Sequence, residues 1–146
     1  MTVRRVAWIL AICGALVLAG LTAALFSSET RIRIPAISAL VTLAMVLLAY
    51  LGGIEWGLAL REEAGTESTR VAALVLATLP AAAAWGLFWL PSPQWQVGAA
   101  GALFLAVWMA DLRLARRGLL PAWFVDLRTA VTAAVAVILG IAFYLL

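Results

Sequence analysis

The sequence predicts an all-α integral membrane protein, a bundle of five transmembrane helices. Of the 146 residues, 66% are apolar and 12% are charged, and the mean hydropathy is +1.12. Soluble domains are about 45–50% apolar and about 25% charged, so a soluble chain of this length could not bury so much apolar surface. The apolar residues also fall into five runs, and about 20 such residues form a helix long enough to cross a bilayer.

The five predicted spans are joined by short polar connections. They cover residues 6–26, 34–60, 71–90, 96–114 and 121–146. The second span is longer than a bilayer requires, so we expect it to tilt or to leave the hydrocarbon at one end. The fourth has an apolar run ending at Ala110 and reaches spanning length only if it continues to Leu114. We therefore expect a single transmembrane domain, residues 1–146, without a soluble domain.

The first span could be mistaken for a signal peptide, because Arg4 and Arg5 precede it. The apolar run covers residues 6–26, whereas a signal peptide has an apolar region of about 7–15 residues. No convincing small-residue cleavage site closes the run. We therefore expect the first helix to be retained.

The arginine distribution predicts the topology. With five spans, the amino terminus and the second and fourth connections share one side, which carries seven arginines, while the other side carries two. The seven are Arg4, Arg5, Arg61, Arg70, Arg113, Arg116 and Arg117, and the two are Arg31 and Arg33. Because cytoplasmic connections are enriched in basic residues, we expect a cytoplasmic amino terminus, an outside carboxyl terminus, and localisation as a multi-pass protein of the bacterial inner membrane.

Composition also narrows the classes of function. The isoelectric point near 10.0 could suggest nucleic acid, but the arginines lie in short gaps between apolar runs, which fits topology signals and lipid headgroups better. The chain has no histidine and one cysteine, Cys13, which we interpret as a small packing residue. We expect no catalytic residues, no metal site and no cofactor, and no nucleic acid among the partners.

Prolines and tryptophans mark the helix ends. Pro35 and Pro121 are each expected to open a helix, where the missing N–H costs nothing. Pro80 lies within the third span and should kink it, as a packing feature or as a functional hinge. The expected interface anchors are Trp85, Trp89 and Trp95 around the uncharged turn "LPSPQW", and Trp108 and Trp123 around the fourth connection.

The stretch "LGGIEWG", near the end of the second span, combines glycines with a carboxylate. Helical spacing places Gly53 and Gly57 on one face as a GxxxG pair, which allows another helix to approach closely. Glu55 falls on nearly the opposite face, together with Gly52. The expected helix-packing motif is Gly52, Gly53, Trp56 and Gly57.

Charged residues from three spans are predicted to meet at the cytoplasmic side. Charges at this depth are costly unless they are paired or hydrated, and arginine pairs well with carboxylates in desolvated places. We expect an internal cluster of Glu55, Asp111 and Arg128, with Arg113 and Asp126 at its rim. Two interpretations remain open, a structural clamp and a polar cavity that serves a ligand or a proton.

Three stretches, "LGGIEWGLAL", "WMADLRLARRGLLPAWF" and "LRTAVT", make the chain resemble the transmembrane protein 69-like family, a bacterial and mitochondrial domain of unknown function (domain 3429). The matching residues are Gly52, Gly53, Trp56, Gly57, Asp111, Pro121, Trp123, Leu127, Arg128 and Thr132. The chain departs from the family pattern at Glu55, where histidine is frequent, at Phe124, where tyrosine stands, and at Val131, where leucine stands. The resemblance implies a small inner-membrane protein and no known activity.

These features favour a non-enzymatic accessory, assembly or structural subunit that docks to a membrane-protein partner or to a second copy of itself. The first alternative is a small-solute or proton pathway through the cluster, with Pro80 as its hinge. The second alternative is an enzyme that acts on a lipid or a quinone.

Overall fold

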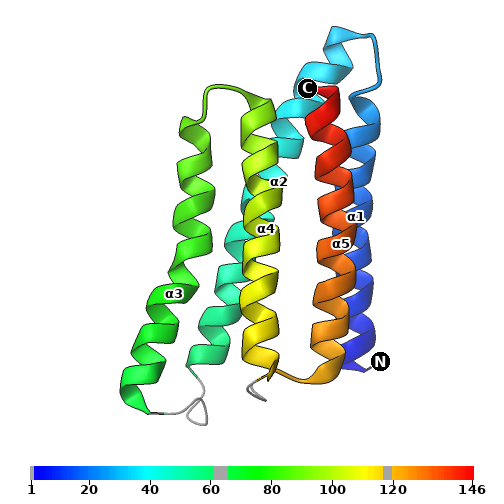
Figure 1. The fold of residues 1–146 in the computed structure, drawn as a ribbon. Helices are drawn as coiled ribbons and strands as arrows, with labels where there is room; N and C mark the ends of the chain where they lie inside the picture. The colour runs from blue at the N-terminus through cyan, green and yellow to red at the C-terminus, as the bar shows by residue number, and fades with distance from the viewer. Residues whose placement is uncertain (1, 61–65, 117–119) are drawn as a thin grey trace.

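The computed structural model describes residues 2–60, 66–116 and 120–146 (Figure 1). Within these residues the chain forms helices and no strand. The five long helices are α1 (Val3–Ala24), α2 (Thr30–Ala59), α3 (Glu67–Gly86), α4 (Pro93–Arg116) and α5 (Ala122–Leu145), and a short 3-10 turn, η1 (Leu87–Trp89), follows α3. All five are long and apolar enough to cross a membrane. This confirms the predicted fold class, a multi-pass helical bundle.

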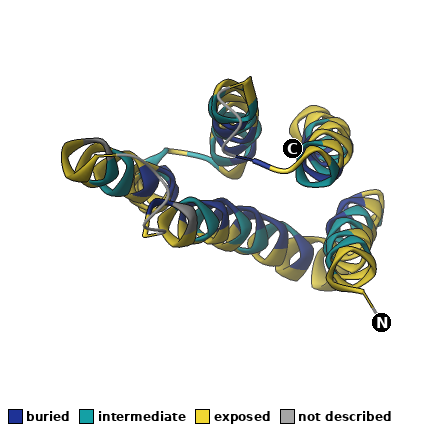
Figure 2. Cartoon of the chain, turned by 90° about the horizontal axis from the view of Figure 1, so that it is seen from below, coloured by how far each residue is buried: buried dark blue, intermediate teal, exposed yellow. Residues whose placement is uncertain are grey.

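The helices form two layers. Seen from below, α1 and α2 lie in one layer and α4 and α5 in the other, with α3 at the edge beside α2 (Figure 2). The main contacts join α2 to α1, α3 and α4, and α5 to α1 and α4. The two termini lie at opposite ends of the bundle (Figure 1), as an odd number of crossings requires. Which end faces the cytoplasm stays a prediction.

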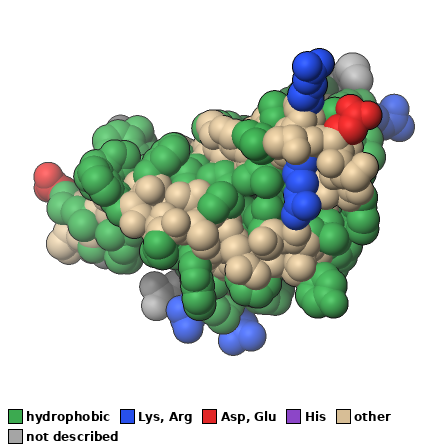
Figure 3. All heavy atoms as spheres, turned by 90° about the horizontal axis from the view of Figure 1, so that it is seen from above, with side chains coloured by type: hydrophobic (Ala, Val, Ile, Leu, Met, Phe, Trp, Pro, Cys, Tyr) green, Lys and Arg blue, Asp and Glu red, His purple; other side chains and the backbone are tan. Residues whose placement is uncertain are grey.

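The core lies between the two layers, where α1 and α2 face α4 and α5. Its largest fully buried side chains come from four helices: Leu18, Leu40, Leu48, Val97 and Leu139. Large apolar side chains also cover the outside of the bundle. Figure 3 shows the end of the bundle that carries the carboxyl terminus, where separate arginine and acidic side chains lie among hydrophobic ones. The exposed apolar side chains of the helices are suited to lipid, which is as apolar as the core itself.

The beginning of α2 corrects one prediction. The helix begins at Thr30, not at Pro35, so Pro35 lies inside it. The backbone N–H groups of Ile32 and Arg33 both donate to the carbonyl of Glu29, 3.0 Å away in each case, and start the helix before the proline. The helix therefore begins in the polar segment that precedes the apolar run. Pro121 directly precedes α5, as expected.

Other helix boundaries also differ from the predicted ranges. α4 continues to Arg116, so the marginal fourth span has full length. α3 ends at Gly86, and its last predicted residues form η1. The arginines Arg61 and Arg117, which entered the prediction of topology, lie outside the described residues. Cys13 is exposed on α1, so its expected role in packing is wrong within this bundle.

Polar side chains tie the helix ends to neighbouring helices. The guanidinium of Arg70 donates to the carbonyls of Ala59 and Leu60, at 3.5 and 3.1 Å, and so satisfies the end of α2. At the other end of the bundle, Arg33 donates to the carbonyl of Leu145 at 2.9 Å. Because the last carbonyls of a helix have no partner within it, these bonds fix the ends of α2 and α5.

Candidate functional site: a polar cluster between α2, α4 and α5

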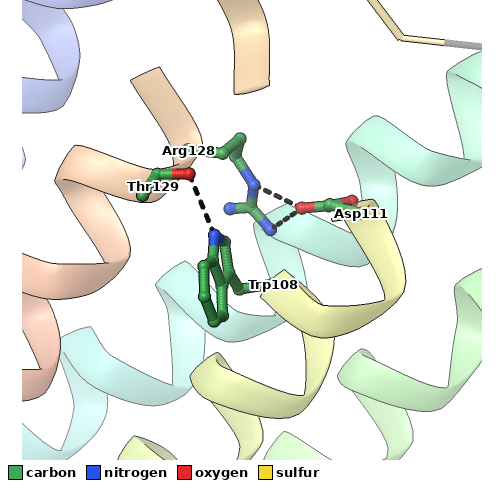
Figure 4. Close-up of polar contacts among 4 residues, drawn as sticks. All are labelled: Trp108, Asp111, Arg128 and Thr129. Carbon is green, nitrogen blue, oxygen red and sulfur yellow. Dashed lines mark hydrogen bonds and ion pairs between the residues drawn. The ribbon is translucent and has the colours of Figure 1, made fainter. Parts of the chain in front are cut away.

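The centre of the site is an ion pair between α4 and α5. The Nε and Nη2 atoms of Arg128 both lie 2.6 Å from Oδ2 of Asp111 (Figure 4). The two residues are only 6% and 3% exposed. The guanidinium thus donates twice to one oxygen of the carboxylate.

Helical spacing explains why these charges are buried. On α4, Asp111 follows Phe104 and Val107 along one buried face. On α5, Arg128 precedes Thr132 and Val135 on the buried face. Residues three or four positions apart share one side of a helix, so each charge replaces an apolar residue in a row that packs against the other helices.

Glu55 reaches the same junction from α2. It belongs to the inward face of α2, which we define as Leu48, Gly52, Glu55 and Ala59; Leu48, Gly52 and Ala59 are buried and Glu55 is half-buried. Its carboxyl group interacts electrostatically with Asp111 and Arg128 and lies within hydrogen-bonding reach of the Asp111 carboxyl group. Its Oε1 atom is inaccessible to solvent and has no hydrogen-bond donor among the described residues. The structure therefore brings together Glu55, Asp111 and Arg128.

The other charged residues of the predicted cluster stay at the surface. Arg113 and Asp126 are exposed, and the ion pair of Arg128 is made with Asp111. Each lies two residues from a member of the ion pair, Arg113 from Asp111 on α4 and Asp126 from Arg128 on α5, but on the exposed side of its helix.

A second contact joins α4 to α5 beside the ion pair. The indole Nε1 of Trp108 donates to the Thr129 hydroxyl at 3.1 Å (Figure 4). Trp108 was expected only as an interface anchor, so this contact was not predicted. Thr132, one turn further along α5, is 2% exposed, and its hydroxyl has no partner within the described part of the chain.

The remaining tryptophans lie near the ends of the helices. Trp85, Trp89 and Trp95 are exposed around the α3–α4 connection, and the rings of Trp85 and Trp89 meet edge to face at 5.9 Å. Trp123 is half-buried at the start of α5, with its ring centroid 5.9 Å from that of Phe124. Such positions are typical of residues that sit at the membrane–water boundary.

The helix-packing motif divides between two faces of α2. A Cβ atom on Gly52 would lie 2.5 Å from the carbonyl oxygen of Ala77 and 3.5 Å from the Cβ of Pro80, so only glycine allows α3 to come this close. Gly53 and Gly57 are exposed, and a Cβ atom on either would meet nothing within 4 Å. The expected GxxxG pair is therefore not used in packing within the described chain.

Gly53 and Gly57 belong to the outward face of α2, which we define as Val46, Tyr50, Gly53 and Gly57. All four are exposed. Trp56, the other member of the motif, is 43% exposed beside this face. The contact of Gly52 with Ala77 was not predicted, because the sequence does not show which side of α3 faces α2.

Two surface hollows lie away from the cluster. One, of about 510 Å³, surrounds Arg4, Arg5 and Trp8 on α1. The other, of about 380 Å³, lies at the opposite end between Arg33, Gln94 and Leu146. Neither is lined by a residue of the cluster, and the described residues contain no group of three side chains that could hold a metal ion.

The chain was also compared with known proteins. No curated protein and no solved structure matches it. A family model does match, over residues 3–144, and it is the model of the numbered domain to which the sequence showed a resemblance; the name transmembrane protein 69-like stays a prediction. The chain therefore belongs to the family described as Protein of unknown function (DUF3429).

Proposed function

We propose that the protein is a non-enzymatic accessory or structural subunit of the bacterial inner membrane, which docks to a transmembrane helix of a partner protein through the outward face of α2. The observation that carries this proposal is the open space at Gly53 and Gly57. Small residues at this spacing let two helix backbones approach closely in lipid, where van der Waals packing drives association.

The glycine on the other side of the helix supports the proposal. At Gly52 the absence of a side chain already allows α3 to pack closely against the backbone of α2. The outward face offers the same kind of surface one position further along, where no helix of the described chain lies. A transmembrane helix of a partner fits there without any rearrangement of the bundle.

Tyr50 adds a second, polar argument. It is 64% exposed on the outward face, nine residues before the last residue of α2, Ala59. Its hydroxyl forms no hydrogen bond with the described residues. An unpaired hydroxyl within a membrane span gains from a hydrogen bond to a neighbouring helix. The proposed partner would supply that bond.

The alternative, a small-solute or proton pathway, has less support. The Asp111–Arg128 pair is almost completely buried, and the two hollows lie elsewhere. Clamping is the simpler role for this pair, because a buried ion pair holds two helices in one register.

Site-specific photo-cross-linking tests the proposal. A photoreactive side chain at Tyr50 should give one discrete adduct with another membrane protein, whereas the same group at Val75 of α3, 60% exposed, should react with lipid. The variant Gly53→Ile fills the open space without touching the bundle and should lower the adduct about tenfold, equivalent to about 1.4 kcal/mol. Adducts with lipid alone, or with a second copy of the chain, would contradict docking to a partner protein.

A further inference from the structure

The polar cluster has more negative than positive groups. Asp111 and Glu55 together carry two carboxyl groups, and among the described side chains one guanidinium, that of Arg128, faces them. If both carboxyl groups are ionised, a net negative charge remains between three membrane-spanning helices. Uncompensated charge at this depth is strongly unfavourable, so the arrangement calls for one further positive charge.

The contacts of Asp111 indicate that the additional positive charge lies between Asp111 and Glu55. Arg128 uses both of its contacts on Oδ2 of Asp111. Glu55 lies within hydrogen-bonding reach of the same aspartate, yet two ionised carboxylates are both acceptors and cannot bond to each other. A proton on one of them turns this repulsive contact into a hydrogen bond.

No described side chain donates a hydrogen bond to the buried oxygen of Glu55, so a proton can bind there. The Oε1 atom of Glu55 has no donor, and the hydroxyl of Thr132, one turn from Arg128 on α5, has no partner in the described ranges. Both atoms are inaccessible to solvent. Buried oxygens with unused bonding capacity in a native protein call for an occupant.

Within residues 2–60, 66–116 and 120–146, other charged groups on the helices around Glu55 do not neutralise it. Its electrostatic neighbours are Asp111 and Arg128. Arg70 of α3 is bonded to the carbonyls at the end of α2. The remaining charged side chains that the structure describes at this end are exposed at the surface: Arg4 and Arg5 on α1, Glu67 on α3, Arg113 and Arg116 on α4, and Asp126 on α5.

We propose that Glu55 and Asp111 form a buried proton-binding site, in which the two carboxyl groups share one exchangeable proton beside the Arg128 guanidinium. With the proton bound, the three groups are neutral overall. Its release leaves one negative charge between α2, α4 and α5. This site is independent of the outward face of α2, because the two faces lie on different sides of the helix.

Infrared spectroscopy of the full chain in lipid nanodiscs tests the site. A protonated carboxyl group absorbs at a different infrared frequency from a carboxylate, and carboxyl groups in water are carboxylates at neutral pH. The parent protein should show one protonated carboxyl band at neutral pH, which shifts in deuterium oxide and disappears when the pH is raised. The variant Glu55→Gln should lose the band, since its amide donates permanently to Asp111.

Controls keep the test decisive. The variant Glu67→Gln makes the same change at an exposed position of α3 and should keep the band. If Glu55→Gln does not fold, Glu55→Met, which removes the charge and keeps the length, replaces it. Absence of the band from the parent protein, or its persistence without Glu55, would overturn the proposal. So would loss of the band when sodium replaces potassium, because a metal cation would then occupy the site.

Discussion

Gly52 and Gly53 are neighbours in the sequence, yet they belong to two faces of α2 with different surroundings. Gly52, on the inward face, is in contact with the backbone of α3, and a methyl group there would collide with the Ala77 carbonyl. Gly53, on the outward face, has nothing within 4 Å of the same position. One glycine is needed for the fold of the chain itself, and the other is available to something outside it.

The comparison shows that glycine spacing alone does not tell which contact a membrane helix makes. Successive residues are rotated by about 100° around a helix. Gly52 therefore faces α3, whereas Gly53, the next residue, faces open surface. The GxxxG pair has the spacing of a packing motif, but the single Gly52 makes the close contact. The following predictions test this difference, beginning with the largest effect.

Removal of the guanidinium that faces the inward side of α2 should have the largest effect. The change Arg128→Ala leaves the carboxyl group of Asp111 buried without its partner, and breaking a buried pair in this way costs about 3–5 kcal/mol. We expect strongly reduced accumulation and a much lower Tm in mild detergent. Arg113→Ala, at an exposed position of the preceding helix, is the control. An Arg128→Ala variant that melts like the parent would show that the pair does not hold the bundle.

Gly52→Ala should be the next most damaging change. The new Cβ atom would lie 2.5 Å from a backbone oxygen, which can move only if α3 shifts as a whole. Overpacking of this kind costs about 1–3 kcal/mol. The measurement is the Tm by circular dichroism in detergent, and an unchanged value would mean that α2 and α3 are further apart than described.

A smaller loss is expected for Gly98→Ala on α4. Its Cβ atom would lie 2.9 Å from two ring atoms of Phe143, but Phe143 is 38% exposed and its ring can turn toward lipid. We expect about 1 kcal/mol, the low end of overpacking. The double variant with Phe143→Leu should recover most of the loss, since residues in contact are energetically coupled. If the double variant is as unstable as Gly98→Ala, the loss of stability comes from the helix backbone and not from contact with the Phe143 ring.

Gly53→Ala should have the smallest effect on the isolated chain. Its Cβ atom points into open space, and alanine favours a helix over glycine by up to about 1 kcal/mol, so the Tm should stay the same or rise slightly. The photo-cross-link from Tyr50 should nevertheless weaken, because the added methyl group stands on the outward face. A lower Tm would place Gly53 in the packing of the bundle.

The fold class could be predicted from the sequence because it depends on bulk properties. Composition and the length of the apolar runs are sufficient to predict five spanning helices, and the structure has them. Helix starts were harder to predict. α2 begins in the polar segment at Thr30, and hydrophobicity carries no signal for a helical turn that lies outside an apolar run.

The meeting of Asp111 with Arg128 could be expected, since opposite charges at neighbouring helix ends have few other partners in a membrane. The contact of Gly52 with Ala77 could not, because it depends on the rotation of α3 about its own axis. Small residues cover most of α3, as in the segment from Ala81 to Ala84, and several rotations would bury equally apolar faces. The position of Trp108 against Thr129 depends on a rotamer, for which the sequence gives no signal.

The ion pair between α4 and α5 also bears on how the chain enters the membrane. Asp111 and Arg128 are 17 residues apart, on helices that follow one another. A nascent hairpin of these two helices can therefore bring its opposite charges together before either helix is fully surrounded by lipid. Transferring a neutral pair into a bilayer is far less costly than transferring two separate ions. On this view the last two helices insert as a unit, and their pairing precedes the assembly of the remaining bundle.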